Sequence, residues 1–223
     1  MHNVRISELF DIEKTIAKDI FNGLDFPWEV LPKIKEFIIE LGNTLPEEKF
    51  YKQGENVWIA KSAKIYPNVY IEGPCIIDEE AEVRPSAFLR GNAIVGKKAV
   101  VGNSTELKNV ILFDGVQVPH FNYVGDSILG YKSHLAAGVI TSNLKGDKSL
   151  VQIKEGEEKL DTNIKKVGAF VGDNVEVGCN SVLSPGTVLG RNVRVYPLSF
   201  VRGVVKENSL YKDKEHIIDL LMK

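Results

Sequence analysis

The chain has 223 residues and a formal net charge of −2, with 43% hydrophobic and 26% charged residues. No basic surplus points to nucleic acid, and no apolar run is long enough to cross a membrane. The start, MHNVRISELFDIEK, lacks the apolar stretch of a secretory signal, so we expect a cytoplasmic protein. Cys75 and Cys179 are too few for a disulfide framework or a structural zinc site.

Residues 1–50 are predicted to form a short helical cap. ISELFDIEKTIAKDIF places apolar residues near helical spacing, and Asp11 can cap the later part of that helix. PWEVLPKIKEFIIELGN predicts a second helix that ends at Gly42. We expect the two helices to cover the open first turn of the following region, because an uncovered turn would expose a sheet edge. A substrate-specific lid is the alternative.

Residues 51–205 repeat with a period of six. An aliphatic residue returns at every sixth position, usually with a small residue two positions before it. The aliphatic positions form two runs: Ile59, Ile65, Ile71, Ile77, Val83, Leu89, Val95, Val101 and Leu107, then Val171, Val177, Leu183, Leu189, Val195 and Val201. This period fits neither a helix nor an ordinary alternating strand. It is typical of a coil with three short strands per eighteen-residue turn, whose interior the aliphatic side chains fill.

The sequence therefore predicts an all-β solenoid, a parallel β-helix of hexapeptide repeats. Eighteen residues per turn give roughly seven turns and about 34 Å of length. Residues 144–166 are a charged insertion, expected to be a solvated hairpin, a functional loop, or both. The tail, 206–223, ends in EHIIDLLMK and is predicted to be a short amphipathic helix.

Three segments of the repeat region carry a more specific pattern: LRGNAIVGKKAVVGNSTELK (89–108), HFNYVGD (120–126) and AAGVITSNLKGDK (136–148). They resemble the hexapeptide-repeat acyltransferases, and among them the C-terminal glucosamine-1-phosphate acetyltransferase domain of the bifunctional bacterial enzymes of UDP-N-acetylglucosamine synthesis. The resemblance covers residues 57–205 and implies a left-handed coil, where chain physics alone favours a right-handed crossover. No glycine-rich nucleotide loop precedes the repeats, so uridyltransferase activity is not expected.

The resemblance also implies roles for single residues. His120 matches the general base, and Tyr123 matches a substrate-contacting tyrosine. Arg90 and Lys108 match the groups that hold the sugar 1-phosphate, and Glu106 matches an acid that contacts the sugar.

Four further positions follow from the same resemblance. Asn143 matches another substrate ligand, and Lys148 matches a loop lysine if one gap is allowed. Ala137 lies where the acetyl group is accommodated, and Cys179 stands where the family has a serine near the acetyl donor. The family turn N-Y-D-G reads Asn-Leu-Lys-Gly at 143–146, a departure that bears on the identity of the acceptor more than on the reaction type.

The residue types suit this chemistry. Transfer of an acetyl group to an amine needs a base near neutral pH, which histidine provides. A phosphate needs cations such as Arg90 and Lys108, which are eighteen residues apart and should therefore lie on adjacent turns. A backbone N–H in the AAG turn (136–138) is expected to stabilise the oxyanion.

Each of these residues also has a purely structural interpretation. His120 follows Pro119 and is compatible with a surface corner, Arg90 and Lys108 fit a solvated ladder, and Asn143 fits a chain turn.

Three functions remain open. The first is an acetyl-CoA-dependent N-acetyltransferase that acts on glucosamine 1-phosphate or a related amino-sugar phosphate; the resemblance implies a homotrimer with coenzyme A between neighbouring subunits. The second, a zinc carbonic anhydrase, needs three histidines around the metal, and only His120 and His134 lie in the repeats, so no metal is expected. The third is a non-catalytic sugar-phosphate-binding or assembly module.

Overall fold

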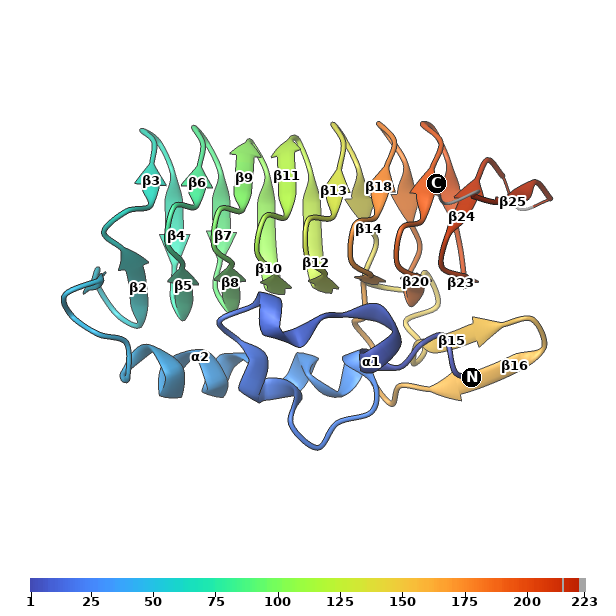
Figure 1. Cartoon of the computed structure of the whole chain (residues 1–223), viewed down its shortest axis with the longest axis horizontal. Helices are drawn as coiled ribbons and strands as arrows, with labels where there is room; N and C mark the ends of the chain where they lie inside the picture. The colour runs from blue at the N-terminus through green and yellow to red at the C-terminus, as the bar shows by residue number, and fades with distance from the viewer. Residues whose placement is uncertain (214, 221–223) are drawn as a thin grey trace.

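The computed structural model describes residues 1–213 and 215–220. Short parallel strands stack into a long three-sided prism, and an N-terminal helical segment and a hairpin lie along one side of it (Figure 1). The predicted parallel β-helix is confirmed. No helix among the described residues is long and apolar enough to cross a membrane.

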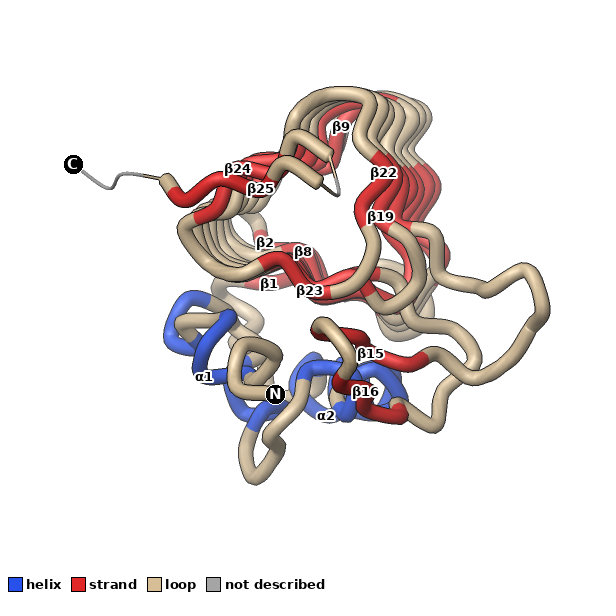
Figure 2. Tube along the Cα trace, turned by 90° about the vertical axis from the view of Figure 1, so that its right-hand side faces the viewer, coloured by secondary structure: helices blue, strands red, loops and turns tan. Residues whose placement is uncertain are grey.

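Each turn contributes one strand to each of three faces (Figure 2). The first face contains β2 (Val57–Ala60), β5 (Cys75–Ile77), β8 (Ala93–Val95), the later parts of β10 (Glu106–Leu112) and β12 (Tyr123–Leu129), β17 (Ala169–Val171), β20 (Thr187–Leu189) and β23 (Val204–Val205). The second contains β3 (Lys64–Ile65), β6 (Glu82–Val83), β9 (Val100–Asn103), β11 (Gln117–His120), β13 (His134–Leu135), β18 (Glu176–Val177), β21 (Arg194–Val195) and β24 (Ser209–Tyr211). The third contains β4 (Tyr70–Glu72), β7 (Phe88–Arg90), the first parts of β10 and β12, β14 (Ile140–Thr141), β19 (Val182–Leu183) and β22 (Phe200–Val201).

The six-residue repeat produces the interior and the corners of this prism. The aliphatic positions from Ile77 onward are buried, and small residues such as Ala81 and Ala99 are fully buried beside them. At many corners the backbone takes a left-handed conformation, for example at Asn92 (φ 51°) and Asn180 (φ 55°). Asparagine tolerates that conformation better than most residues with a side chain, which explains its recurrence at the corners.

The N-terminal segment is less helical than predicted. It consists of α1 (Ile6–Leu9), 3₁₀ turns at Ile12–Lys14, Lys18–Phe21, Pro27–Glu29 and Leu31–Lys33, and α2 (Ile34–Gly42). The long first helix was a wrong prediction, since only its first turn is α-helical. Phe10 and Phe21 both pack on Phe113 of the prism, with ring centroids 5.3 and 5.7 Å away, and this packing overrides local helix propensity. Asp11 does cap the following 3₁₀ turn, because its carboxylate accepts the Glu13 N–H at 3.2 Å.

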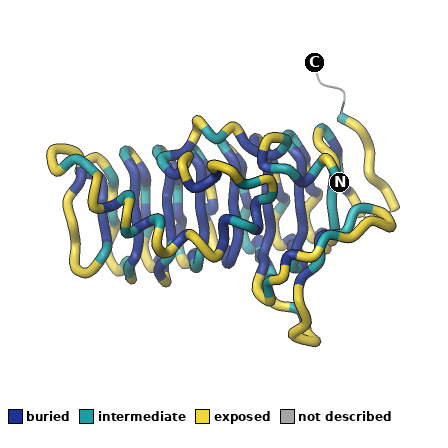
Figure 3. The backbone as a smooth tube through the Cα atoms, turned by 90° about the horizontal axis from the view of Figure 1, so that it is seen from below, coloured by how far each residue is buried: buried dark blue, intermediate teal, exposed yellow. Residues whose placement is uncertain are grey.

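The segment covers the first face of the prism and not, as predicted, its open first turn (Figures 1 and 2). Helix α2 packs against β5, β8 and β10. The edge of β2 is instead covered by β1 (Phe50–Lys52), which pairs with it antiparallel. An apolar side chain projecting outward from the first face therefore meets the segment, and the buried core continues from the prism into it (Figure 3).

The insertion forms an antiparallel hairpin of β15 (Gln152–Glu155) and β16 (Glu158–Asp161). One side is not solvated, because Val151 and Ile153 are fully buried. The hairpin extends the cover of the first face beside the N-terminus, where the Asn3 amide donates to the Glu155 carboxylate at 2.5 Å.

The predicted C-terminal helix is wrong for the described part of the tail. There, β24 continues the stack beyond residue 205, and β25 (Ile217–Asp219) pairs with it antiparallel. An open strand edge supplies hydrogen-bond partners that an isolated helix of this length lacks, so the tail adds strands. The prism is therefore longer than the roughly seven turns predicted.

Candidate functional site

Arg90 and Glu106 form an ion pair on the third face. The Arg90 Nη1 donates to the Glu106 Oε1 at 2.6 Å, and both side chains are partly exposed. The hydrogen bond that Arg90 donates to Glu106, together with the negative charge of that carboxylate, raises the pKa of Arg90, so the guanidinium stays charged. Arg90 lies on β7 and Lys108 on the neighbouring β10, as the eighteen-residue spacing predicts.

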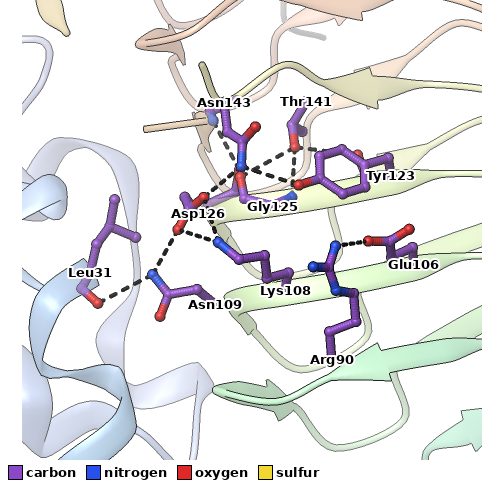
Figure 4. Close-up of polar contacts among 12 residues, drawn as sticks. Leu31, Arg90, Glu106, Lys108, Asn109, Tyr123, Gly125, Asp126, Thr141 and Asn143 are labelled. Atoms are coloured by element: carbon purple, nitrogen blue, oxygen red, sulfur yellow. Dashed lines mark hydrogen bonds and ion pairs between the residues drawn. The ribbon is translucent and has the colours of Figure 1, made fainter. Parts of the chain in front are cut away.

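Asp126 lies at the corner where β12 passes from the third face to the first, and the sequence analysis did not single it out. The residue is only 4% exposed, and its carboxylate accepts hydrogen bonds from three side chains (Figure 4). The donors are the Lys108 Nζ at 3.3 Å, the Asn109 Nδ2 at 3.0 Å and the Asn143 Nδ2 at 2.5 Å. Two of the predicted substrate ligands are therefore held by one buried carboxylate.

Tyr123 joins this arrangement through Asn143. The Asn143 Nδ2 donates to the Tyr123 hydroxyl at 3.1 Å. Burial raises the pKa of Tyr123, and the nearby Asp126 charge adds to the effect, so the phenol remains neutral at physiological pH. In the strand register Tyr123 lies directly beside Glu106, which places the tyrosine next to the Arg90 ion pair.

Gly125 makes room for these contacts. A Cβ atom there would lie 2.5 Å from the Tyr123 hydroxyl oxygen and 3.0 Å from the Asn143 Nδ2. Any larger residue would push both side chains away, so the glycine of HFNYVGD is explained by the cluster that lies over it. We call Arg90, Glu106, Lys108, Tyr123, Asp126 and Asn143 the third-face cluster.

His120 lies on the second face, at the end of β11, across a corner from this cluster. Its side chain is exposed, and the imidazole has no hydrogen-bond or ion-pair partner among the described residues. The backbone is firmly held: the His120 N–H donates to the Asn122 Oδ1 at 3.1 Å, and the His120 carbonyl accepts the Gly138 N–H at 3.0 Å. Asn122 is itself buried and donates to the Ala136 carbonyl at 2.8 Å.

The two predicted donor-side residues stack near His120. The Ala137 carbonyl accepts the Asn180 N–H at 2.8 Å, which links it to the turn that carries Cys179. Cys179 is an exposed free thiol. One chain thus presents His120, Ala137 and Cys179 on adjacent turns, and the third-face cluster around the corner from them.

Lys148 is not brought to the cluster. It is exposed, at a left-handed position in the insertion, and no hydrogen bond or ion pair joins it to the cluster in the part of the chain that the structure describes. The start of the insertion instead borders a cavity of about 500 Å³ over β19 and β22, whose lining includes Lys145, Lys154 and Arg202.

Comparison with known proteins gives one family model and several relatives. The model described as the GMPPB C-terminal domain matches residues 71–156. A protein named bifunctional protein GlmU from Methanococcus maripaludis is 34% identical over 206 residues, which are 90% of this chain and 49% of that protein. A bifunctional sugar-1-phosphate nucleotidylyltransferase/acetyltransferase from Sulfurisphaera tokodaii is 31% identical over 112 residues, 50% of this chain and 28% of that protein.

Solved structures are similar at a lower level. A putative acetyltransferase from Bacillus cereus has a TM-score of 0.41 and 15% identity, covering 78% of this chain and 83% of that one. A mutant of AntD, an N-acyltransferase from Bacillus cereus, has a TM-score of 0.33 and 18% identity, covering 78% of this chain and 92% of that one. At these TM-scores neither structure bears on the assignment.

The chain spans about half the length of the GlmU protein from Methanococcus maripaludis that it matches. Its repeats form a parallel β-helix, and its HFNYVGD segment contributes to a polar cluster at the positions that the resemblance singled out. Together with the identity to GlmU proteins, this confirms the predicted resemblance to the C-terminal acetyltransferase domain of the GlmU-type proteins.

Proposed function

We propose that the chain catalyses acetyl-CoA-dependent N-acetylation of an amino-sugar phosphate, with glucosamine 1-phosphate as the first candidate. The observation that carries this proposal is the third-face cluster. It gathers two cations, each paired with a carboxylate, together with a neutral phenol and an amide, and these groups suit a phosphorylated sugar. The matched relatives named as bifunctional GlmU or acetyltransferase proteins support the same reaction class.

Arg90 is suited to bind the phosphate without leaving Glu106. A guanidinium has five N–H donors, and the Glu106 Oε1 occupies one nitrogen of Arg90 at 2.6 Å. Lys108 adds a second positive charge on the next strand. In this arrangement the second oxygen of Glu106 is free to accept a hydrogen bond from a hydroxyl or ammonium group of the sugar.

His120 is the proposed general base. Its exposed imidazole takes the proton from the sugar amine while the nitrogen attacks the thioester carbonyl of acetyl-CoA. A carbon–nitrogen bond forms and the carbon–sulfur bond breaks. The imidazolium then returns the proton to the departing thiolate, so the products are the N-acetyl sugar phosphate and free coenzyme A.

The AAG turn supplies one oxyanion donor at most. The Gly138 N–H is already donated to the His120 carbonyl at 3.0 Å. That hydrogen bond holds the backbone of His120, and it leaves the Ala137 N–H of the same turn as the proposed donor to the tetrahedral oxyanion.

A homotrimer completes the proposal. The uncovered second and third faces carry exposed apolar side chains, among them Tyr70, Phe200 and the corner residue Leu198, which is 79% exposed. Exposed apolar patches commonly mark interfaces. In a trimer, His120 of one subunit and the third-face cluster of another would line a shared groove that holds coenzyme A.

The test is thiol release from acetyl-CoA with glucosamine 1-phosphate, comparing the wild type with His120→Ala. We expect sugar-dependent release, reduced about 10²–10⁴-fold in the variant because the general base is lost. His134→Ala is the matched control, since His134 also lies in the repeats but pairs with Glu176 at 2.8 Å. It should retain near wild-type rates.

Galactosamine 1-phosphate is assayed in parallel, because the sequence motifs do not distinguish between these two amino sugars. Absence of release with both sugars would refute the proposed acceptor. Sugar-phosphate binding without any release would instead favour the non-catalytic binding module.

A further inference from the structure

The inference concerns Asp126, the buried carboxylate of the third-face cluster. A carboxylate on a residue that is only 4% exposed is costly to bury unless charges or hydrogen bonds compensate it. Here one ammonium and two amides do so: Lys108 and Asn109 reach its Oδ1, and Lys108 and Asn143 reach its Oδ2. The donors come from two different parts of the chain, β10 and the residue before the insertion.

These contacts fix the positions of groups that the proposed function assigns to the substrate. The Lys108 ammonium is held by both oxygens, at 3.3 and 3.5 Å. The Asn143 amide lies between the Asp126 carboxylate and the Tyr123 hydroxyl, at 2.5 and 3.1 Å (Figure 4). Asp126 thus orients Lys108 and Asn143 directly, and Tyr123 through Asn143.

Asn109 connects this carboxylate to the N-terminal segment. Its Nδ2 donates to the Asp126 Oδ1 at 3.0 Å and to the Leu31 carbonyl at 3.3 Å (Figure 4). One amide nitrogen therefore bridges the segment that covers the first face and the cluster on the third face. The segment reaches the candidate site through a polar contact as well as through the core.

We propose that Asp126 is a positioning residue that holds the sugar-phosphate ligands in place, and that Asn109 couples it to the N-terminal segment. This inference rests on the proposed function. Asp126 does not touch the substrate; it acts by keeping Lys108 and Asn143 at fixed places on the prism. Loss of its charge releases both groups and thereby weakens sugar-phosphate binding.

The test measures the Kd of glucosamine 1-phosphate by calorimetry without acetyl-CoA, for the wild type and Asp126→Asn. Asparagine keeps the size and tolerates the left-handed backbone at this position (φ 47°), so the charge is the main change. We expect Kd to rise about 10-fold or more, the typical effect of losing hydrogen bonds to a charged group. In steady-state assays the KM for the sugar rises while the KM for acetyl-CoA is unchanged.

Asp173→Asn is the matched control. Asp173 is also 4% exposed, but its carboxylate holds the Asp11 and Tyr131 N–H groups at 2.7 and 2.8 Å, away from the cluster. Because these contacts lie away from the cluster, Asp173→Asn should leave Kd unchanged, whatever its effect on the melting temperature. An equal rise of Kd in both variants, or a Kd within about twofold of the wild type in Asp126→Asn, would overturn the positioning role.

Asn109→Gly keeps the inference testable if Asp126→Asn fails to fold. Glycine removes the amide and accepts the left-handed backbone of this residue (φ 53°). We expect Kd to rise about threefold, and an unchanged Kd would refute the coupling. A wild type that binds the sugar phosphate without transferring acetyl would refute the proposed function alone, whereas absence of binding would refute both.

Discussion

At the scale of single residues, the Asp126 carboxylate organises the third-face cluster, because it accepts hydrogen bonds from Lys108, Asn109 and Asn143. Arg90, Lys108 and Tyr123 stood out because their types match a phosphate and a sugar. Asp126 has no such signature, since an aspartate after a glycine usually marks a turn. Its place also depends on a departure from the repeat: the turn from β10 to β12 has seventeen residues, so Lys108 lies beside Gly125, and Asp126 reaches the ammonium from the corner that follows. The eighteen-residue spacing does hold one turn earlier, where it places Lys108 next to Arg90.

Asp78 gives a test of electrostatics within the prism. Burial raises its pKa to about 6, and the charges of Asp114 and Glu79 add to the effect. Because the folded pKa lies above the unfolded one, the folded state binds the proton more tightly. Its contribution to stability is fully present below about pH 4 and is lost as the pH rises through 6.

We therefore expect Asp78→Asn to stabilise the protein at pH 7.5 by up to about 3 kcal/mol and to have little effect at pH 4. The asparagine oxygen can still accept the Glu79 N–H, which the aspartate accepts at 2.7 Å. Urea unfolding at the two pH values measures the difference. An equal effect at both would show that the carboxylate is not perturbed in the folded state.

At the scale of elements, the strands and the helix that ends at Gly42 followed from the sequence, whereas the long first helix and the C-terminal helix did not. A period of six repeated over many turns is a strong signal, because every turn imposes the same packing. The N-terminal segment and the tail have no such repetition, and their structure depends on what they meet. Ile12–Lys14 forms a 3₁₀ turn along the prism, and Ile217–Asp219 pairs with an open strand edge. In both segments, tertiary contacts and not local sequence preference determine the secondary structure.

Gly102 tests how closely successive turns approach. A Cβ atom there would lie 1.5 Å from the Pro119 carbonyl oxygen on the next turn, so Gly102→Ala should force the strands apart. We expect a loss of at least about 3 kcal/mol in the free energy of unfolding, the upper end for overpacking. Gly146→Ala is the control, since nothing lies within 4 Å of that position. Similar urea midpoints for the two variants would contradict the close approach.

At the scale of the whole molecule, the exposed apolar side chains of the prism bear on its assembly into a trimer. The proposed trimer predicts a mass three times the 24.8 kDa of the chain in sedimentation equilibrium at micromolar concentration. The physical reason is the apolar surface left on the second and third faces, such as Phe200, which is 63% exposed. A monomer mass under these conditions would refute the shared groove, and the site would then have to be completed within one chain.

The covered first face has a consequence for how such a protein can change in length. In a bare solenoid, an added turn is tolerated because each turn contacts only its neighbours. Here one segment is attached at fixed intervals: α2 to β5 and β8, Phe10 to Phe113, and the Leu9 carbonyl to the Asp173 N–H at 3.0 Å. An extra turn between Phe113 and Asp173 would separate those attachments by about a further 4.8 Å. The N-terminal segment therefore fixes the number of turns between its attachment points, and a duplicated turn beneath it would require a longer segment.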